Sequence, residues 1–265
     1  MRRFVEAKKG EIERLLKNRD SLLETSVPPR ESRPDFLSAL KRGKEERGLG
    51  LICEYKRASP SLGDIELGVS PARAAQAYAR ADCLSVLTEE FYFKGKIDHL
   101  FEMGPKPLLR KDFIFHPLQL EETARTPAAA VLLIASLLPA GSESVNFFSL
   151  AETLGLQAVV EVTNPGELKT ARTLGAGIVQ VNARNLSTLK LDFGANLRFI
   201  KENPPRPDEF WIAASGIKTA EDLSRLIEAG YSAALVGTAL MRGGNLKGRL
   251  DDLLNGLERL CPKRY

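Results

Sequence analysis

Lysine, glutamate and asparagine side chains stand at the ends of strongly apolar segments of this 265-residue chain. Glu54 and Lys56 close the first such segment, Lys111 closes the third, and Glu161 and Asn182 close the fifth and sixth. A charge buried without a partner is costly, so charges at these places need a structural or a chemical reason. A lysine that gives up a proton beside a carboxylate that accepts one can perform general acid–base catalysis. We therefore predict an enzyme that moves protons with these side chains.

Small and hydroxyl-bearing residues follow the last two apolar segments. One segment runs into Ser215 and Gly216, and the other runs into Gly237 and Thr238. Glycine lets the backbone approach an anion closely, while hydroxyl and amide groups donate hydrogen bonds to it. The two turns together predict a site for the phosphate group of a small molecule. Two ordinary glycine turns are the alternative interpretation.

Other kinds of site have little support in the sequence. His99 and His116 are the only histidines, and no CxxC, HExxH or paired-histidine spacing occurs. We therefore expect no metal centre and no Ser-His-Asp triad. Cys53, Cys83 and Cys261 are interpreted as reduced thiols, because their number is odd and two of them lie inside apolar runs.

Charge and hydropathy narrow the range of partners. The net charge of +4 is small, and charges of both signs alternate in runs such as residues 41–47. This pattern is typical of a solvated helix face and not of a nucleic-acid-binding stripe. The first residues lack the apolar core of a signal peptide, and no apolar run reaches membrane-spanning length. We expect a cytoplasmic monomer that binds a small phosphorylated molecule and neither a membrane nor a nucleic acid.

Eight apolar segments that favour β-strands recur after residue 50, each followed by a polar loop and an amphipathic helical stretch. Their spacing of roughly 20 to 33 residues suits one strand–loop–helix unit. Apolar strands in alternation with helices indicate a parallel sheet covered by helices, and eight units can close into a (β/α)8 TIM barrel. An open doubly wound sheet is the competing α/β fold, but it usually carries a Gly-rich phosphate loop, and no GxGxxG or Walker sequence occurs. The predicted strands are 51–55, 84–87, 108–111, 131–135, 158–162, 177–181, 210–214 and 233–236.

Capping residues mark several of the predicted helices. Ser70-Pro71 begins a helix over 72–80, Asn164 with Glu167 has the arrangement of a capping box, and Thr219 begins the seventh helix. Gly230 stands where a helix ends in a left-handed residue. Residues 1–48 lie outside the repeat and carry too little apolar surface for a domain of their own. We predict that 1–48 form a helical extension packed on a barrel of residues 49–265.

The active site of such a barrel lies at the C-terminal ends of its strands. Side chains alternate between the two faces of a strand, so Glu54 and Lys56 share one face, and Lys111 shares a face with Phe113. Each charged group taken alone could belong to a structural ion pair. Polar groups at the ends of four strands on a consistent face favour a catalytic site instead.

The residues at these strand ends also resemble a known family. Residues 54–61, EYKRASPS, resemble the first-strand signature of indole-3-glycerol phosphate synthases, and LRKDFI at 109–114 resembles their third strand. Further similar segments follow in the same order around all eight strands: 87–89 with Tyr92, Phe93 and Gly95; 131–134; 161–162; 181–182 with Arg184, Asn185 and Leu186; 215–217; and 236–241.

The resemblance implies a reaction of tryptophan biosynthesis. The substrate would be 1-(2-carboxyphenylamino)-1-deoxyribulose 5-phosphate, which closes a ring and then loses carbon dioxide and water without a cofactor. Lys111 would be the acid of ring closure, Glu161 the base of dehydration, and Lys56 or Lys111 the acid of dehydration. Lys56 could also hold the substrate carboxylate, Glu54 would hold both lysines in position, and Asn182 would hydrogen-bond hydroxyls or the catalytic groups.

The remaining site residues are implied in the same way. Those that enclose the aromatic ring would be Phe93, Phe113 and Leu132. Those that bind the phosphate would be Ser59, Ser215, Gly216, Gly237 and Thr238, with Arg184 as a further substrate-binding residue.

Two positions depart from the family pattern. Ala214 stands where the family usually has glutamate, and Ala183 replaces the usual polar residue after the sixth strand. Neither change removes a candidate acid or base. Three alternatives stay open: a Schiff-base aldolase, a non-catalytic phosphate-ligand sensor, and a phosphoribosylanthranilate isomerase, whose expected thiol base fits poorly because Cys53 faces away from Glu54.

Overall fold

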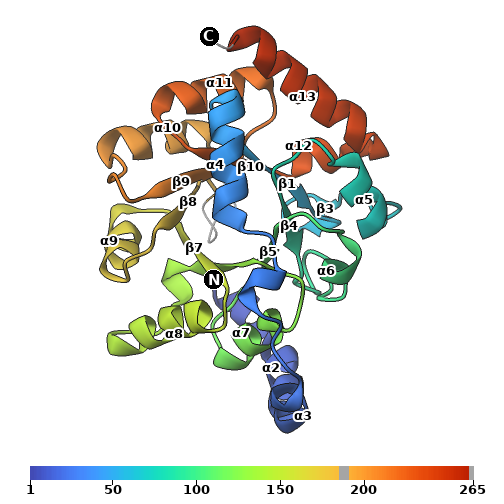
Figure 1. The fold of residues 1–265 in the computed structure, drawn as a ribbon, viewed down its shortest axis with the longest axis vertical. Helices are drawn as coiled ribbons and strands as arrows, with labels where there is room; N and C mark the ends of the chain where they lie inside the picture. The colour runs from blue at the N-terminus through green and yellow to red at the C-terminus, as the bar shows by residue number, and fades with distance from the viewer. Residues whose placement is uncertain (185–190, 263–265) are drawn as a thin grey trace.

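The computed structural model describes residues 1–184 and 191–262 and forms a closed barrel of eight parallel strands surrounded by helices (Figure 1). Asn185 and Leu186, which carry part of the family resemblance, lie outside the described residues. Every neighbouring pair in the barrel is parallel, and β1 closes the ring by pairing with both β4 and β10. The barrel strands are β1 (Gly50–Tyr55), β4 (Cys83–Leu87), β5 (Leu108–Lys111), β6 (Ala130–Ile134), β7 (Gln157–Val162), β8 (Ile178–Asn182), β9 (Phe210–Ala214) and β10 (Ala233–Val236).

The TIM-barrel prediction is therefore confirmed, and the strand boundaries agree to within a residue or two. The strands β9 and β10 have the predicted limits, whereas β6 begins at Ala130 and stops at Ile134, before a short 3-10 helix, η2 (Ala135–Leu137). A two-stranded hairpin, β2 (Ala58–Ser59) with β3 (Gly63–Asp64), lies in the loop after β1. This hairpin was not expected from the sequence.

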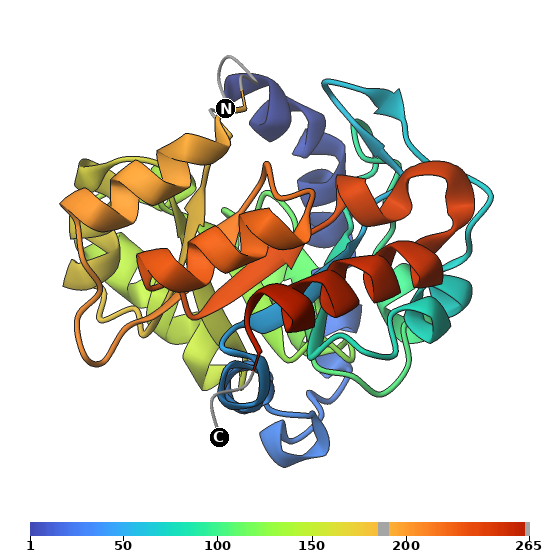
Figure 2. The ribbon, with the colours of Figure 1, turned by 90° about the horizontal axis from the view of Figure 1, so that it is seen from above.

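Helices cover the outside of the barrel in the order that alternation requires (Figures 1 and 2). Between strands lie α5 (Pro71–Ala77), α6 (His99–Glu102), α7 (Pro117–Ala124), α8 (Ser142–Thr153), α9 (Pro165–Thr173), α10 (Phe193–Glu202) and α11 (Ala220–Ala229), and after β10 come α12 (Thr238–Met241), the 3-10 helix η3 (Arg242–Gly244) and α13 (Leu246–Leu260). No helix of the described residues is long and apolar enough to cross a membrane.

The predicted caps are present with one change of detail. The Ser70 side chain accepts a hydrogen bond at the start of α5, Thr219 and Asp222 form a capping box on α11, and Gly230 ends α11 with φ 98°. Asn164 caps α9 by accepting from Glu167 N, but the Glu167 carboxylate accepts from Thr163 N and Oγ1. Asn164 therefore caps the helix as predicted, but the Glu167 carboxylate accepts from Thr163 and not from the backbone nitrogen of Asn164.

Two apolar clusters lie on the two faces of the sheet. Ile52, Leu109, Val159, Ile178 and others fill the barrel interior, whereas their sequence neighbours, such as Cys53 and Val160, pack outward against the helices. Side chains alternate along a strand, and on β1, β5, β7 and β8 the inward residues nearest the C-terminal ends are polar, namely Glu54, Lys111, Glu161 and Asn182. The site is therefore positioned by ordinary strand alternation.

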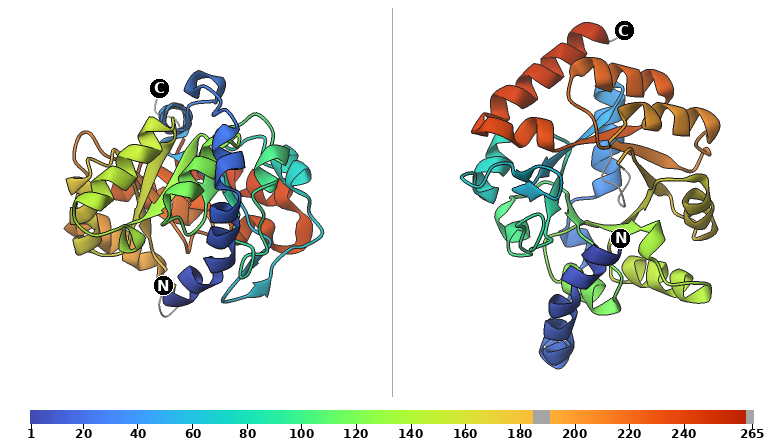
Figure 3. Two further views of the ribbon diagram at one scale, coloured as in Figure 1. Left: turned by 90° about the horizontal axis from the view of Figure 1, so that it is seen from below. Right: turned by 180° about the vertical axis from the view of Figure 1, so that it is seen from behind.

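The N-terminal segment runs along the outside of the barrel from one end to the other (Figures 2 and 3). Its helices are α1 (Arg2–Ala7), α2 (Lys9–Lys17), α3 (Arg19–Glu24), η1 (Arg30–Ser32) and α4 (Phe36–Arg47). At the end where the strands begin, the α4 residues Phe36 and Leu40 are fully buried, and the backbone nitrogen of Phe36 donates to Gln157 at the start of β7. At the other end Phe4 stacks on Phe113, with ring centroids 4.2 Å apart. The division at residue 48 into an extension and a barrel stays a prediction.

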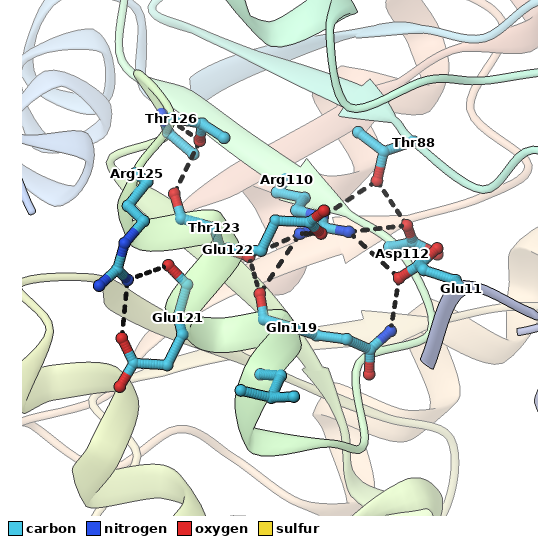
Figure 4. Close-up of polar contacts among 12 residues, drawn as sticks. Glu11, Thr88, Arg110, Asp112, Gln119, Glu121, Glu122, Thr123, Arg125 and Thr126 are labelled. Atoms are coloured by element: carbon cyan, nitrogen blue, oxygen red, sulfur yellow. Dashed lines mark hydrogen bonds and ion pairs between the residues drawn. The ribbon is translucent and has the colours of Figure 1, made fainter. Parts of the chain in front are cut away.

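A buried polar network fastens this segment beside the third barrel strand. Lys8, only 2% exposed, contacts Asp112 at 2.8 Å and also pairs with Glu11. Figure 4 shows Arg110 at the centre of the network, donating to Glu122 Oε2 at 3.0 Å and to Thr88 Oγ1 at 3.1 Å. Burial raises the pKa of Asp112, but Lys8 and Arg110 outweigh this effect and lower it. The N-terminal segment thus supplies the ion-pair partners of two buried charged side chains beside β5: Lys8 pairs with Asp112, and Glu11 pairs with Arg110.

Candidate active site

The C-terminal ends of the strands surround a cavity of about 510 Å³. Of the predicted site residues, the following line it: Glu54, Lys56, Phe93, Lys111, Phe113, Leu132, Glu161, Asn182, Arg184, Ser215, Gly216, Gly237 and Thr238. Ser59 is the exception, because it is buried in β2 and does not belong to the cavity wall, whereas Ser61 does. The structure thus brings together residues from all eight strand ends and the loops that follow them.

Glu54 joins the two lysines at the centre of the site. Its carboxylate lies 2.7 Å from Lys56 Nζ through Oε1 and 3.1 Å from Lys111 Nζ through Oε2. Glu54 is only 2% exposed, so the water that would otherwise solvate its charge is largely excluded. One carboxylate therefore neutralises and orients two ammonium groups from different strands.

The two lysines differ in how strongly they hold their protons. Burial lowers the pKa of Lys111, but the nearby carboxylates Glu54 and Glu161 outweigh this effect and raise it above its ordinary value. Burial also lowers the pKa of Lys56, and there Glu54 offsets only part of the effect. Burial raises the pKa of Glu54, but the two lysines outweigh it and bring it to about 2. The carboxylate is thus ionised and Lys111 is protonated at neutral pH.

Glu161 is held by amide groups instead of cations. Gln180 Nε2 donates to its Oε2 at 2.6 Å, and Asn182 Nδ2 donates to its Oε1 at 3.0 Å. Both amides come from β8, which pairs in register with β7. The side-chain oxygen of Asn182 in turn accepts from Arg184 N at 2.9 Å. This arrangement fixes a buried carboxylate at the cavity wall, where it can accept a proton.

An apolar wall faces these polar groups. Phe93 and Phe113 lie with ring centroids 6.3 Å apart, and Leu132 lines the cavity beside them. The Glu89 carboxylate accepts hydrogen bonds from the backbone nitrogens of Phe91, Tyr92 and Phe93 at 2.7–3.0 Å, which fixes the loop that carries Phe93. A planar aromatic ring could pack against this wall.

The predicted phosphate end has an unusual backbone. Ser215 has φ 71°, and Gly216 follows it with φ 83°. A non-glycine residue in the left-handed region is strained by about 1–3 kcal/mol, and such strain concentrates at functional sites. Thr238 begins the four-residue helix α12. The two turns meet at one side of the cavity and suit a compact anion.

Gly237 has a second role that its backbone angles do not reveal. Its φ of −122° is open to any residue, but a β-carbon there would overlap Oε1 of Glu54 and lie 3.0 Å from its Cδ. The absence of a side chain at Gly237 therefore leaves room for the carboxylate that joins the two lysines.

We expect Gly237→Ala to lower kcat by about 10- to 100-fold, because Glu54 must move and the lysines with it. Steady-state kinetics on the folded variant provides the measurement. Gly177→Ala is the matched control, since the nearest atom to a β-carbon there is 3.8 Å away. An unchanged kcat in Gly237→Ala would show that Glu54 tolerates displacement.

The two alanines that we expect to depart from the family pattern lie close together. Ala214 is fully buried in the barrel interior at the end of β9, where it pairs in register with Asn182. Ala183 follows that asparagine, and its nitrogen donates to Ala214 O at 3.1 Å. Without a carboxylate at 214, Glu54 is the only acidic side chain within 4.0 Å of the Lys56 ammonium among residues 1–184 and 191–262.

Sequence reasoning missed several residues of the cavity wall and one, Gln180, that lies behind it. Ser61 accepts a hydrogen bond from Arg184 Nη1 at 3.2 Å, and Gln180 holds Glu161 from below the site. Three basic residues, Lys218, Arg242 and Arg249, also line the cavity. Gln180 shares the inward face of β8 with Asn182, so strand alternation could have identified it. The three cations lie in loops and helices, where no such alternation applies.

The environment of Cys53 does not fit the isomerase alternative. Cys53 is fully buried on the outward face of β1, and burial raises its pKa far above the ordinary value. It therefore cannot supply the thiol base of an isomerase. Among residues 1–184 and 191–262 there is also no group of three or more His, Cys, Asp or Glu side chains that could hold a metal ion.

Comparisons with known proteins agree with this geometry. A family model described as indole-3-glycerol phosphate synthase matches residues 1–253. The indole-3-glycerol phosphate synthase of Lacticaseibacillus paracasei is 39% identical over 222 residues, which cover 81% of this chain and 82% of the relative. That of Streptococcus pneumoniae is 36% identical over 256 residues and 95% of each chain.

A solved structure supports the fold alone. The mutant tryptophan synthase α-subunit of Pyrococcus furiosus aligns with 78% of this chain and 98% of its own, with a TM-score of 0.56 and 16% identity. At this identity the likeness extends to the barrel and not to the chemistry.

Proposed function

The chain belongs to the indole-3-glycerol phosphate synthase family, and from this premise we propose which of its side chains carry out the reaction. The enzyme is a carboxy-lyase of tryptophan biosynthesis. Its substrate, 1-(2-carboxyphenylamino)-1-deoxyribulose 5-phosphate, becomes indole-3-glycerol phosphate with loss of one carbon dioxide and one water. The observation that carries the assignment of roles is the pair of lysines joined by the buried carboxylate of Glu54.

Ring closure needs an acid, which we assign to Lys111. The ring carbon that bears the carboxylate attacks the ketone carbon, and the ketone oxygen takes a proton as the new carbon–carbon bond forms. The raised pKa of Lys111 keeps this proton in place until the oxygen becomes basic. Carbon dioxide then leaves from the ring carbon that made the attack, and the electron pair of the broken bond restores the aromatic ring.

Dehydration needs a base and an acid. Glu161 is suited to remove a proton from the CH2 carbon between the ring nitrogen and the carbon that bears the hydroxyl group, because its carboxylate is fixed by two amides and faces the cavity. Loss of this proton and of the hydroxyl group forms the double bond of the indole ring. Lys56 or Lys111 protonates the departing hydroxyl group. Lys56, whose pKa is lowered, can also hold the substrate carboxylate before decarboxylation.

Binding groups orient the substrate between these residues. Phe93, Phe113 and Leu132 would enclose the aromatic ring, and Asn182 and Arg184 would hydrogen-bond the central hydroxyl groups. Ser215, Gly216, Gly237 and Thr238 would bind the phosphate. Ser59 stays a predicted phosphate ligand, although Ser61 lies nearer to the cavity.

The proposed active unit is a cytoplasmic monomer that needs no cofactor. The acidic and basic groups to which we assign roles, Glu54, Lys56, Lys111 and Glu161, line one cavity of a single chain, which supports a monomeric active unit. Light scattering during turnover would test this part of the proposal. A dimer whose dissociation abolishes activity would contradict it.

Indole fluorescence and carbon dioxide release test the reaction together. Purified protein in chelator-containing buffer, mixed with the carboxyphenylamino-deoxyribulose phosphate, should form both products in equal amounts. Tight binding without turnover would indicate a sensor or a decayed enzyme and would draw attention to Ala214. A borohydride-trapped lysine adduct would favour Schiff-base chemistry instead.

A further inference from the structure

Three basic side chains at the outer part of the cavity have no partner in the described structure. Lys218, Arg242 and Arg249 line the cavity and are exposed to solvent. None of these side chains forms a hydrogen bond or an ion pair with residues 1–184 or 191–262. Lys247 differs, since it lies on the same helix as Arg249 but pairs with Asp251 at 2.8 Å. We call Lys218, Arg242 and Arg249 the basic rim.

The basic rim is placed around the predicted phosphate end. Lys218 comes two residues after Gly216, and Arg242 comes directly after α12, which begins at Thr238. Arg249 lies on the first turns of α13, and a β-carbon at Gly243 would be 3.5 Å from its Nη2. Three separate segments of chain thus direct positive charge to one side of the cavity.

The acidic residues of the cavity do not cancel this charge. Among residues 1–184 and 191–262, the wall contains six basic side chains and three acidic ones, Glu54, Asp112 and Glu161. Glu54 is engaged by Lys56 and Lys111, and Asp112 by Lys8 and Arg110. Glu161 accepts from two amides deeper in the barrel. Among the described lining residues, positive side chains therefore outnumber negative ones, and the negative ones already have partners.

We propose that the basic rim captures the phosphorylated substrate electrostatically and so determines kcat/KM, an inference that rests on the proposed function. A cleft lined by charge of one sign can raise the association rate of an oppositely charged ligand by about 10- to 1000-fold. The Debye length is about 8 Å at physiological ionic strength, so cations at the mouth still act on a phosphate that enters. Guanidinium groups can also bind phosphate oxygens through paired hydrogen bonds.

The same charges distinguish substrate from product. The substrate carries a phosphate and a carboxylate, and decarboxylation removes the carboxylate charge. The product is therefore held less strongly by the rim, which assists its release. Substrate affinity should weaken more steeply with salt than product affinity does.

A charge-removal variant tests the rim against a matched control. The rim variant is Lys218→Gln/Arg242→Gln/Arg249→Gln. The control, Lys41→Gln/Arg42→Gln/Lys201→Gln, removes the same charge from exposed residues on α4 and at the end of α10. Circular dichroism checks that both variants are folded, and kcat/KM is measured from about 10 mM to about 500 mM ionic strength.

At low salt we expect the rim variant to lose about tenfold in kcat/KM, mainly through KM, and the control to lose little. The difference between rim variant and wild type should shrink as salt is added. An equal loss in both variants, or a loss in the rim variant that salt does not change, would overturn the proposal. A wild type that forms no indole product would contradict the proposed function instead, so the two failures are distinguishable.

Discussion

Replacement of Lys111 by methionine is expected to lower kcat by about 10²–10⁴-fold, the usual contribution of a positioned general acid. Methionine keeps most of the length and apolar volume of the side chain and removes only the proton donor. Glu54 keeps its contact with Lys56, so its charge is not left without a partner. The measurement is single-turnover formation of indole product, which separates chemistry from product release.

The control for this variant is Lys106→Met. Lys106 is also partly buried and lies just before the same strand, where its Nζ donates to Ala81 O at 2.7 Å far from the cavity. Its replacement should leave the single-turnover rate nearly unchanged. A Lys111→Met enzyme with more than about a tenth of the wild-type rate would remove Lys111 from the role of principal acid. The acid would then have to be sought at Lys56.

Much of the barrel and its catalytic centre could be predicted because both depend on local alternation. Continuous apolar strands gave the positions of β9 and β10 to the residue, and capping residues located the starts of α5 and α11. Period-two alternation also places Glu54, Lys111 and Glu161 on inward faces, where the structure has them. Polar residues at such inward positions are visible in a sequence because their neighbours are apolar.

Features that depend on distant contacts could not be predicted in this way. The pairing of Lys8 with Asp112 joins residues 104 positions apart, and a charged residue near the N-terminus usually indicates a solvated face. Ser61 lines the cavity and Ser59 does not, because Ser59 is paired in the β2–β3 hairpin, which reverses the chain within a few residues. The close approach of Gly237 to Glu54 arises only when β10 closes the barrel against β1.

Replacement of Glu54 by glutamine should affect activity and its pH dependence together. Glutamine has nearly the same size as glutamate, so the Lys56 and Lys111 ammonium groups should keep their positions. They lose the negative charge that lies between them. Since Glu54 is the main group that raises the pKa of Lys111 against burial, that pKa should fall in the variant. We expect kcat to drop by about 100-fold or more, and the alkaline limb of the kcat–pH profile to move to lower pH.

The pH profile separates this role from simple structural damage. A Glu54 that only supported the fold would lower kcat without moving the alkaline limb. Gly237→Ala, which keeps the carboxylate but displaces it, should move the limb in the same direction and by less. An unmoved limb in both variants would show that Glu54 does not control the charge state of Lys111.

The stability of the Glu54→Gln protein supplies an independent measurement. The pKa of Glu54 is about 2 in the folded protein against an ordinary value of 4.5, so its ionisation stabilises the fold. This contribution is fully present above pH 4.5 and is lost as the pH falls toward about 2. The free energy of unfolding, measured by denaturant titration, should therefore differ most between wild type and Glu54→Gln above pH 4.5 and converge at lower pH. A difference that stays constant across this range would mean that the carboxylate charge is not what holds the two lysines in place.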